Sequence, residues 1–173
     1  MFLQLVGALI VMLSCTIAGI CFGKKINYRI EELEQMQSAM TMLQNQIHFL
    51  ATPLPEAMEE IGLKYDNIIG NLFLKTAKEM EKREEEKGEE IWKKVVLNWK
   101  EKTYLEKQDI DAILCFGCSM GYLDITQQKA SISLLLQYIE MTLVQLQEKK
   151  KQQQKLYPSM GILGGMLIVV VLL

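Results

Sequence analysis

The chain has 173 residues, of which 50% are hydrophobic and 23% are charged, and its formal net charge is −2. A general nucleic-acid binder needs a basic excess on one face, and this near-neutral composition shows none. Every Lys, Arg, Asp and Glu lies between residues 24 and 155. This division predicts a water-exposed domain between two apolar, membrane-embedded ends.

The first segment, residues 1–23, carries no Lys, Arg, His, Asp or Glu. At about 1.5 Å per residue it forms a helix of about 34 Å, and a hydrocarbon core is about 30 Å thick. We therefore predict a transmembrane helix over residues 1–23. A cleaved signal peptide is the alternative, but no basic residue precedes the apolar run, and the run is longer than a signal-peptide core of about 7–15 residues.

A long amphipathic helix is predicted next, because apolar residues recur at steps of three and four up to the Thr52-Pro53 dipeptide. These residues are Ile26, Ile30, Leu33, Met36, Met40, Leu43, Ile47 and Leu50. Pro55 suits the first position of a short second helix that ends before Gly62. Asp66 is the predicted N-cap of a third helix.

The inward faces of the remaining helices follow from the same spacing. In the second helix they are Ala57, Met58 and Ile61, and in the third Ile68, Ile69, Leu72, Phe73, Ala77 and Met80. In the fourth they are Ile91, Trp92, Val95, Val96 and Trp99, and in a fifth helix over about 105–120 they are Ile110, Ile113, Leu114 and Gly117. In the sixth they are Ile132, Leu135, Leu136, Ile139, Leu143 and Leu146. Gly121 should end the fifth helix, and Asp124 or Thr126 should cap the sixth, which can run to Lys155. No alternating strand pattern occurs, so the fold class is all-α: a six-helix antiparallel bundle over residues 24–155.

The last segment, residues 156–173, is predicted to be a short second transmembrane helix, because Ser159 to Leu173 carry no charged side chain. Pro158 is expected to break the helix near the interface, which leaves about 21 Å. The basic residues next to both spans lie on the side of the central domain: Lys24, Lys25 and Arg29, and Lys149, Lys150, Lys151 and Lys155. Since Lys and Arg are retained in the cytoplasm, the domain is predicted to be cytoplasmic.

Motifs for catalysis are absent from the sequence: it has no Gly-rich phosphate loop, H-E-x-x-H or nucleophile–base pattern. Cys115 and Cys118 form a C-x-x-C, but late in a helix the dipole opposes a thiolate, and zinc would need ligands beyond His48, the only histidine. We interpret both cysteines as packing residues and His48 as a surface or partly buried side chain. The chain is therefore predicted not to be an enzyme and to bind no cofactor or metal.

Small residues at helical spacing occur in both apolar segments. Cys15, Gly19 and Gly23 form one ridge, and Gly161 and Gly165 form another. Such residues let helix backbones approach closely in lipid. We predict that the two ridges pack against each other, within one chain or between neighbouring copies.

Four short motifs are distributed along the chain. They are Thr52-Pro53-Leu54, Phe116-Gly117 with Gly121 and Asp124, Gln127-Gln128-Lys129, and Gly161-Ile162-Leu163-Gly164-Gly165. Together with the size and the two terminal spans, they resemble the stage III sporulation protein AB family of endospore-forming bacteria over nearly the whole chain. The resemblance implies a cytoplasmic domain similar to the six-helix domain of type II secretion F proteins, the membrane platforms that meet a secretion ATPase.

The implied role is assembly: a mother-cell membrane subunit of the channel complex between mother cell and engulfed forespore. The implied partners are membrane lipid, the sporulation protein AA ATPase and other subunits of that complex, and a homo-oligomer is compatible with them. A membrane-anchored helical adaptor of another complex is the alternative, followed by a small redox or metal protein that uses the C-x-x-C.

An acidic tip is formed by Glu84, Glu85, Glu86, Glu89 and Glu90, beside the Gly88 turn. Anionic lipid attracts the Lys clusters near the spans and repels these carboxylates, so the tip is predicted to face the cytosol. We hypothesise that it steers a basic surface of the ATPase by complementary charge. A merely solubilising loop is the other interpretation.

Overall fold

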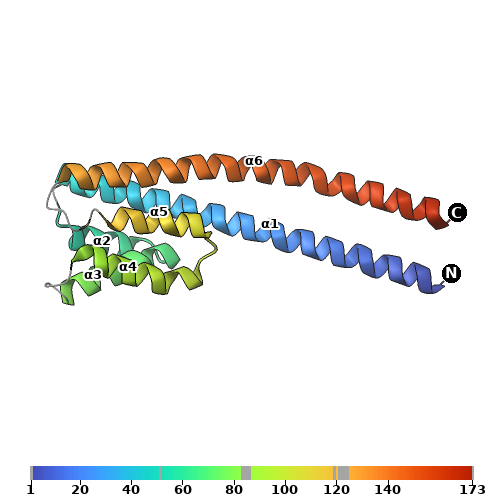
Figure 1. The fold of residues 1–173 in the computed structure, drawn as a ribbon, viewed down its shortest axis with the longest axis horizontal. Helices are drawn as coiled ribbons and strands as arrows, with labels where there is room; N and C mark the ends of the chain where they lie inside the picture. Colours follow the sequence, from blue (N-terminus) through green and yellow to red (C-terminus); the bar gives the residue numbers. More distant parts are fainter. Residues whose placement is uncertain (1, 51, 83–86, 119, 121–124, 173) are drawn as a thin grey trace. The chain divides into compact units, whose positions relative to one another are not determined.

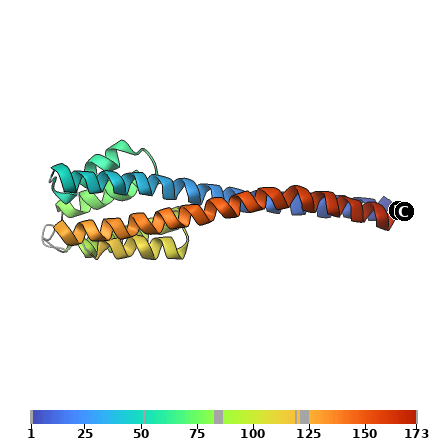
Figure 2. The ribbon, with the colours of Figure 1, turned by 90° about the horizontal axis from the view of Figure 1, so that it is seen from above.

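In a computed structural model, the backbone is described for residues 2–50, 52–82, 87–118, 120 and 125–172, and side chains for 24–50, 52–82, 87–118, 120 and 127–152. All regular structure within these ranges is helical (Figure 1), so the predicted all-α class is confirmed. The chain divides into two compact units: residues 29–143, here called the helical domain, and residues 1–28 together with 144–173. Within the helical domain, α1 and α6 are neighbours (Figure 2), and Gln44 of α1 donates a hydrogen bond to Ser133 of α6 at 3.1 Å.

Helix α1 spans Phe2–Asn45 and continues as a π-helical turn over Gln46–Leu50. Six of the eight predicted apolar positions on this helix are buried: Ile30, Leu33, Met36, Met40, Leu43 and Ile47. Ile26 is only half-buried. Leu50 is 70% exposed, so the predicted stripe ends at Ile47.

Helices α2 (Leu54–Lys64) and α3 (Ile68–Lys82) form a tight pair. A Cβ on Gly62 would lie 2.6 Å from the Cβ of Leu74, so the crossing requires glycine. The predicted cap of α3 was wrong by one residue: the Asn67 side chain accepts hydrogen bonds from the backbone N–H groups of Ile69 and Gly70, both at 2.9 Å. Because α3 begins at Ile68, its N-cap position is residue 67 and not Asp66.

Helices α4 (Gly88–Trp99) and α5 (Lys107–Gly117) are joined through a 3-10 turn over Lys100–Lys102. All five predicted inward residues of α4 are buried. In α5, Ile110, Ile113 and Gly117 are buried as predicted, whereas Leu114 is half-buried and Phe116 takes the inward position. The helix is shorter than the predicted 105–120, because Glu106 caps it at residue 107. Gly121 lies outside the described residues.

Aromatic side chains form the centre of the domain. Trp92 is fully buried between Phe73 and Phe116, whose ring centroids lie 6.0 and 5.3 Å away. Its Nε1–H donates to the Ile113 carbonyl at 2.8 Å, so the indole is buried without an unpaired donor. A Cβ on Gly117 would lie 2.2 Å from Trp92 Cδ1, which explains the glycine at this point of α5.

Helix α6 spans Ile125–Leu172 without interruption. Five of its six predicted inward residues are buried, and Leu136 is half-buried. The predicted break at Pro158 and the predicted end at Lys155 were both wrong, because α6 continues to Leu172. Proline removes one backbone hydrogen bond, but the other backbone hydrogen bonds of the helix remain. Thr126 already lies inside α6, and Asp124 is outside the described residues.

In the part of the chain whose side chains are described, no helix has the length and apolar character to cross a bilayer. The two predicted spans, residues 1–23 and 156–173, fall outside this part. Their backbone is helical over residues 2–23, in α1, and 156–172, in α6.

Candidate functional site

The sequence-predicted site residues fall in two groups. Cys15, Gly19 and Gly23 belong to α1 and Gly161 and Gly165 to α6, where the backbone is helical and the side-chain packing lies outside the described residues. In the acidic tip, Glu84, Glu85 and Glu86 also lie outside them. Glu89 and Glu90 occupy the first turn of α4 and are exposed, where carboxylates are favoured by the helix dipole.

The C-x-x-C lies at the carboxyl end of α5, as predicted, but its side chains are not packing residues. Cys115 and Cys118 are both exposed free cysteines. Desolvation and the nearby Glu89 carboxylate raise the pKa of the Cys118 thiol, which disfavours the nucleophilic thiolate. His48 is exposed beside Phe49 in the π-helical turn. Among the described residues, no cluster of three metal-ligating side chains is present.

A buried ionic cluster joins three helices of the domain. Arg29 of α1 donates from Nε and Nη2 to the two carboxylate oxygens of Asp109 in α5, at 2.8 and 3.0 Å. Its Nη1 lies 2.7 Å from the Glu106 carboxylate. The Tyr138 hydroxyl of α6 donates to Asp109 Oδ1 at 2.8 Å. The cluster therefore ties α1, α5 and α6 together through one carboxylate that is 1% exposed.

Local sequence explains how Asp109 reaches this position. Glu106 is the N-cap of α5, and Asp109 is the third residue of the helix. The Asp109 side chain accepts a hydrogen bond from the Glu106 backbone N–H at 2.7 Å, and the Glu106 side chain accepts one from the backbone of residue 109, so the two form a capping box. The same residue caps α5 and anchors Arg29.

The electrostatics of the cluster favour a permanent ion pair. Burial alone would lower the pKa of Arg29, but its hydrogen bond to Asp109 and the Asp109 charge outweigh burial and raise it. Burial and the hydrogen bond to Asp109 raise the pKa of Tyr138 to about 12. Neither group exchanges a proton near neutral pH, so the arrangement suits holding helices together and does not suit acid–base chemistry.

A second polar contact links α1 to the loop before α5. The Glu32 carboxylate, 7% exposed, accepts hydrogen bonds from the Thr103 hydroxyl and from the Tyr104 backbone N–H, the latter at 2.8 Å. Burial raises the pKa of Glu32, although these hydrogen bonds oppose the shift. Arg29 and Glu32 therefore form two anchors one turn apart on the same helix.

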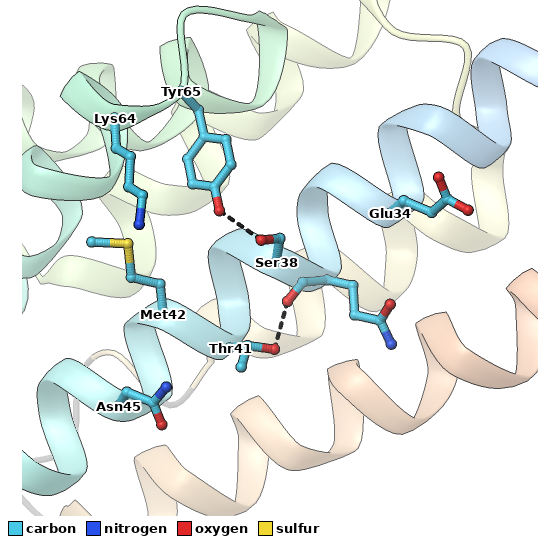
Figure 3. Close-up of a pocket in the computed structure, with 8 residues that line it drawn as sticks. Glu34, Ser38, Thr41, Met42, Asn45, Lys64 and Tyr65 are labelled. Carbon is cyan, nitrogen blue, oxygen red and sulfur yellow. Dashed lines mark hydrogen bonds between the residues drawn. The ribbon is translucent and has the colours of Figure 1, made fainter.

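An open groove of about 420 Å³ is lined by residues of α1 and by Lys64 and Tyr65 at the end of α2 (Figure 3). The Ser38 and Tyr65 hydroxyls share a hydrogen bond of 2.6 Å, and the Thr41 hydroxyl donates to the Gln37 carbonyl at 2.8 Å. Figure 3 shows the Glu34 carboxylate set apart from the Ser38–Tyr65 pair. The two hydroxyls are thus partnered with each other, and the described residues of the groove form no nucleophile–base pair.

Sequence reasoning missed both polar anchors. Arg29 was interpreted only as a charge flanking the first span, and Glu32, Asp109 and Tyr138 were not singled out. One signal was present: Arg29 and Glu32 directly precede the apolar positions 30 and 33, so they fall at the edge of the buried stripe. The Glu-x-x-Asp spacing at 106–109 was a second signal, for a helix start.

Both the sequence and the fold match known proteins. The family model for "Stage III sporulation protein AB" matches residues 4–173. The chain belongs to the stage III sporulation protein AB family. One relative in this family, stage III sporulation protein AB of Bacillus subtilis (strain 168), is 23% identical over 171 residues, covering 99% of each chain. A solved structure of a stage III sporulation protein AB matches with a TM-score of 0.67 and 20% identity, over 72% of this chain and 98% of the other. The sequence-based family resemblance is thus confirmed, and the structural match supports the helical fold.

Proposed function

We propose that this chain is a non-enzymatic, membrane-anchored platform subunit of the sporulation channel complex, and that its helical domain docks a secretion-type ATPase. The observation that carries the proposal is membership of a stage III sporulation family over residues 4–173, which includes both apolar ends as well as the domain. The Arg29 cluster supports a rigid scaffold rather than a catalytic site, because Arg29 and Tyr138 hold fixed protonation states near neutral pH.

Membrane anchoring is supported by the two uncharged ends and the basic residues beside them. The inner flanks of both segments carry Lys, which favours a cytoplasmic domain and two termini across the mother-cell membrane around the forespore. The ends continue the same helices, α1 and α6, that carry Arg29 and Tyr138. A partner bound to the domain would therefore be linked to the membrane by continuous helix.

ATPase docking is supported by the acidic tip. Glu89 and Glu90 are exposed at the start of α4, and three further glutamates precede them at positions 84–86. Clustered carboxylates accelerate encounter with a basic surface, and ionic strength weakens that effect. The tip is therefore the surface where we expect the ATPase to approach.

Co-purification tests this proposal. Full-length protein in detergent is mixed with the sporulation protein AA ATPase from the same organism, and complex formation is followed at low and high salt. Replacing the five tip glutamates by Gln should slow association and flatten its salt dependence. A matched variant with five other exposed glutamates replaced, Glu31, Glu56, Glu101, Glu140 and Glu148, should behave like the unmodified protein. If the ATPase does not co-purify with the unmodified protein, the platform role is wrong, and pull-down from sporulating cells would then test the adaptor alternative.

A further inference from the structure

Helix α6, which lies along one edge of the helical domain (Figure 1), carries apolar side chains on two opposite faces. One face packs into the core and includes Ile132, Leu135 and Ile139, which are at most 3% exposed. On the other face, Leu134 and Met141 are 66% and 58% exposed. At about 100° per residue, Ile139 and Met141 point about 160° apart around the helix axis. A surface helix normally has polar residues opposite its buried face, so the outer face of α6 is unusual.

The outer residues follow the spacing of a seam by which helices pair. Ala130, Leu134, Gln137 and Met141, here called the α6 seam, are separated by steps of four, three and four, and all are exposed. The next step of three reaches Val144, the first residue of α6 beyond the domain, which is 53% exposed. Single exposed apolar side chains are ordinary on protein surfaces, whereas a heptad repeat of them is typical of helix pairing.

The surroundings of the α6 seam are almost uncharged. Glu140 is the only Lys, Arg, Asp or Glu between positions 130 and 147, although 23% of the chain is charged. A strongly charged partner, such as a basic protein surface or an anionic membrane, finds little complementary charge here. A neutral apolar surface is the better match, because burial of apolar area is the main favourable term in most protein association. A second copy of the seam is such a surface.

Gln137 makes the α6 seam complementary to itself. In a two-fold pair of seams, Gln137 lies opposite its own counterpart, and an amide side chain has both a donor and an acceptor. The two amides can therefore bond to each other between the apolar layers formed by Leu134 and Met141. A single polar residue within an apolar seam is a common device that fixes the register and the number of paired helices.

The continuity of α6 sets the direction of pairing. The helix runs from Ile125 to Leu172 without interruption, and its last part is the second predicted span. Two copies anchored in one membrane therefore have parallel α6 helices, and each seam residue lies opposite its own counterpart in a two-fold contact. This step rests on the membrane anchoring proposed above, whereas the pairing of the seams does not.

We propose that the α6 seam packs in parallel against the same seam of a second copy, so that the protein is a homodimer in the membrane. From Ala130 to Val144 the paired helices run together for about 21 Å. Leu134 and Met141 each meet their counterparts, and Gln137 bonds across the axis. The acidic tip consists of other residues, so dimerisation and ATPase docking are separate claims.

Sedimentation equilibrium of the full-length protein in detergent tests the pairing. Replacing Leu134 and Met141 together by Glu should weaken dimerisation about tenfold or more, because apolar contacts are lost and like charges face each other. The control replaces Leu63 and Leu97, which are 70% and 39% exposed on α2 and α4, together by Glu. This control should dimerise like the unmodified protein. Circular dichroism should show equal helicity in both variants, since all four side chains are exposed.

Disulfide crosslinking in membranes tests the direction. All four native cysteines are replaced by Ser, and a single cysteine is introduced as Leu134→Cys or Met141→Cys. A parallel pair brings each introduced cysteine to its own counterpart, so either variant alone should form a crosslinked dimer under mild oxidation. An antiparallel pair would crosslink only in a mixture of the two variants. Lys93→Cys, at an exposed position of α4, is the control and should remain monomeric on the gel.

Four outcomes decide the proposal. It is overturned if the unmodified protein is monomeric in detergent and neither seam cysteine crosslinks, or if the two double-glutamate variants dimerise equally. Crosslinks found only in the mixture would make the pair antiparallel and contradict the parallel arrangement. If the protein is monomeric and the seam variant alone loses co-purification with the ATPase, the seam binds that partner and not a second copy. Flotation of the same membrane samples shows separately whether anchoring holds.

Discussion

At the scale of single residues, Asp109 connects α1, α5 and α6, which lie far apart in the sequence of the helical domain. It accepts two hydrogen bonds from Arg29, one from Tyr138 and one from its own helix start at Glu106. Replacing a fully paired buried ion pair by apolar residues changes the free energy of unfolding little. Removing one partner, which leaves an unpaired buried charge, lowers it strongly. The cluster therefore matters more for which helices meet than for overall stability.

We predict that Asp109→Asn destabilises the helical domain by about 3 kcal/mol, the lower end for breaking a buried pair, because Glu106 still neutralises part of the Arg29 charge. Urea unfolding reports this change through tryptophan fluorescence, since both tryptophans, Trp92 and Trp99, are buried in the domain. Glu106→Gln, on a side chain that is 55% exposed, is the matched control and should cost less than about 1 kcal/mol. Equal effects of the two substitutions would show that the buried pair has no special role.

We predict that Glu32 makes the free energy of unfolding depend on pH with a sign opposite to that of most carboxylates. Burial raises its pKa in the folded state, so the folded protein binds the proton more tightly than the unfolded chain, whose pKa is about 4.3. Stability that depends on this group is therefore present at low pH and is lost as pH rises through the raised pKa. Glu32→Gln keeps an acceptor for Thr103 and Tyr104 but has no charge to bury. The stability of the variant relative to the unmodified protein should increase from about pH 4 to pH 7, measured by urea unfolding; a decrease would mean that the hydrogen bonds outweigh burial.

At the scale of elements, the close packing of α4 against α5 depends on Gly117. A Cβ there would lie 2.2 Å from Trp92 Cδ1, and Trp92 cannot move freely because its Nε1–H is bonded to Ile113 and its ring lies between Phe73 and Phe116. We predict that Gly117→Ala destabilises the domain by about 1–3 kcal/mol, the usual cost of overpacking. Cys115→Ala, on the exposed side of the same helix, should change stability by less than about 0.5 kcal/mol. Crystallography or the near-UV spectrum of Trp92 would show the displaced indole, and an unchanged unfolding curve would contradict the argument.

Comparison of the helices shows what sequence reasoning could and could not predict. The apolar faces of α4 and α6 were predicted almost residue by residue, because helical spacing is a local signal. The partner of Arg29 was not, because Asp109 lies 80 positions away and an isolated contact leaves no periodic pattern. Helix ends were predicted only approximately. Asn67, not Asp66, caps α3, and Pro158 does not end α6. The loss of one backbone hydrogen bond costs less than the neighbouring hydrogen bonds of a long, cooperative helix contribute.

At the scale of the whole molecule, the proposed topology makes the domain accessible from one side of the membrane only. Protease added to the cytoplasmic face of inverted vesicles should digest the domain, while tags at both termini stay protected, because the Lys clusters flank both predicted spans on the domain side. Western blots against the two tags and against the domain measure this directly. Digestion of the domain only from the outer face would reverse the orientation, and loss of one tag would show that one end does not cross.

The two glycine ridges give a prediction for the ends of the same helices. From the predicted cytoplasmic flank into each predicted span, α1 carries Gly23, Gly19 and Cys15, and α6 carries Gly161 and Gly165. Lipid provides no hydrophobic drive between helices, so close backbone packing at small residues is one of the few forces that can pair them. We predict that Gly19→Ile and Gly161→Ile each reduce assembly of the complex and leave the helical domain folded.

Volume-conserving controls separate packing at glycine from a general effect of isoleucine in the predicted spans: Leu13→Ile and Leu167→Ile should assemble normally. A direct measurement is disulfide crosslinking in membranes. With Cys15, Cys21 and the two exposed cysteines Cys115 and Cys118 replaced by Ser, a cysteine introduced beside Gly19 should crosslink to one introduced beside Gly161. The crosslink can form within one chain or between copies, and the mobility of the product on a gel distinguishes the two. If no crosslink forms, and strains that carry either isoleucine variant sporulate fully, the glycines face lipid. The predicted spans would then be kept together by the helical domain alone.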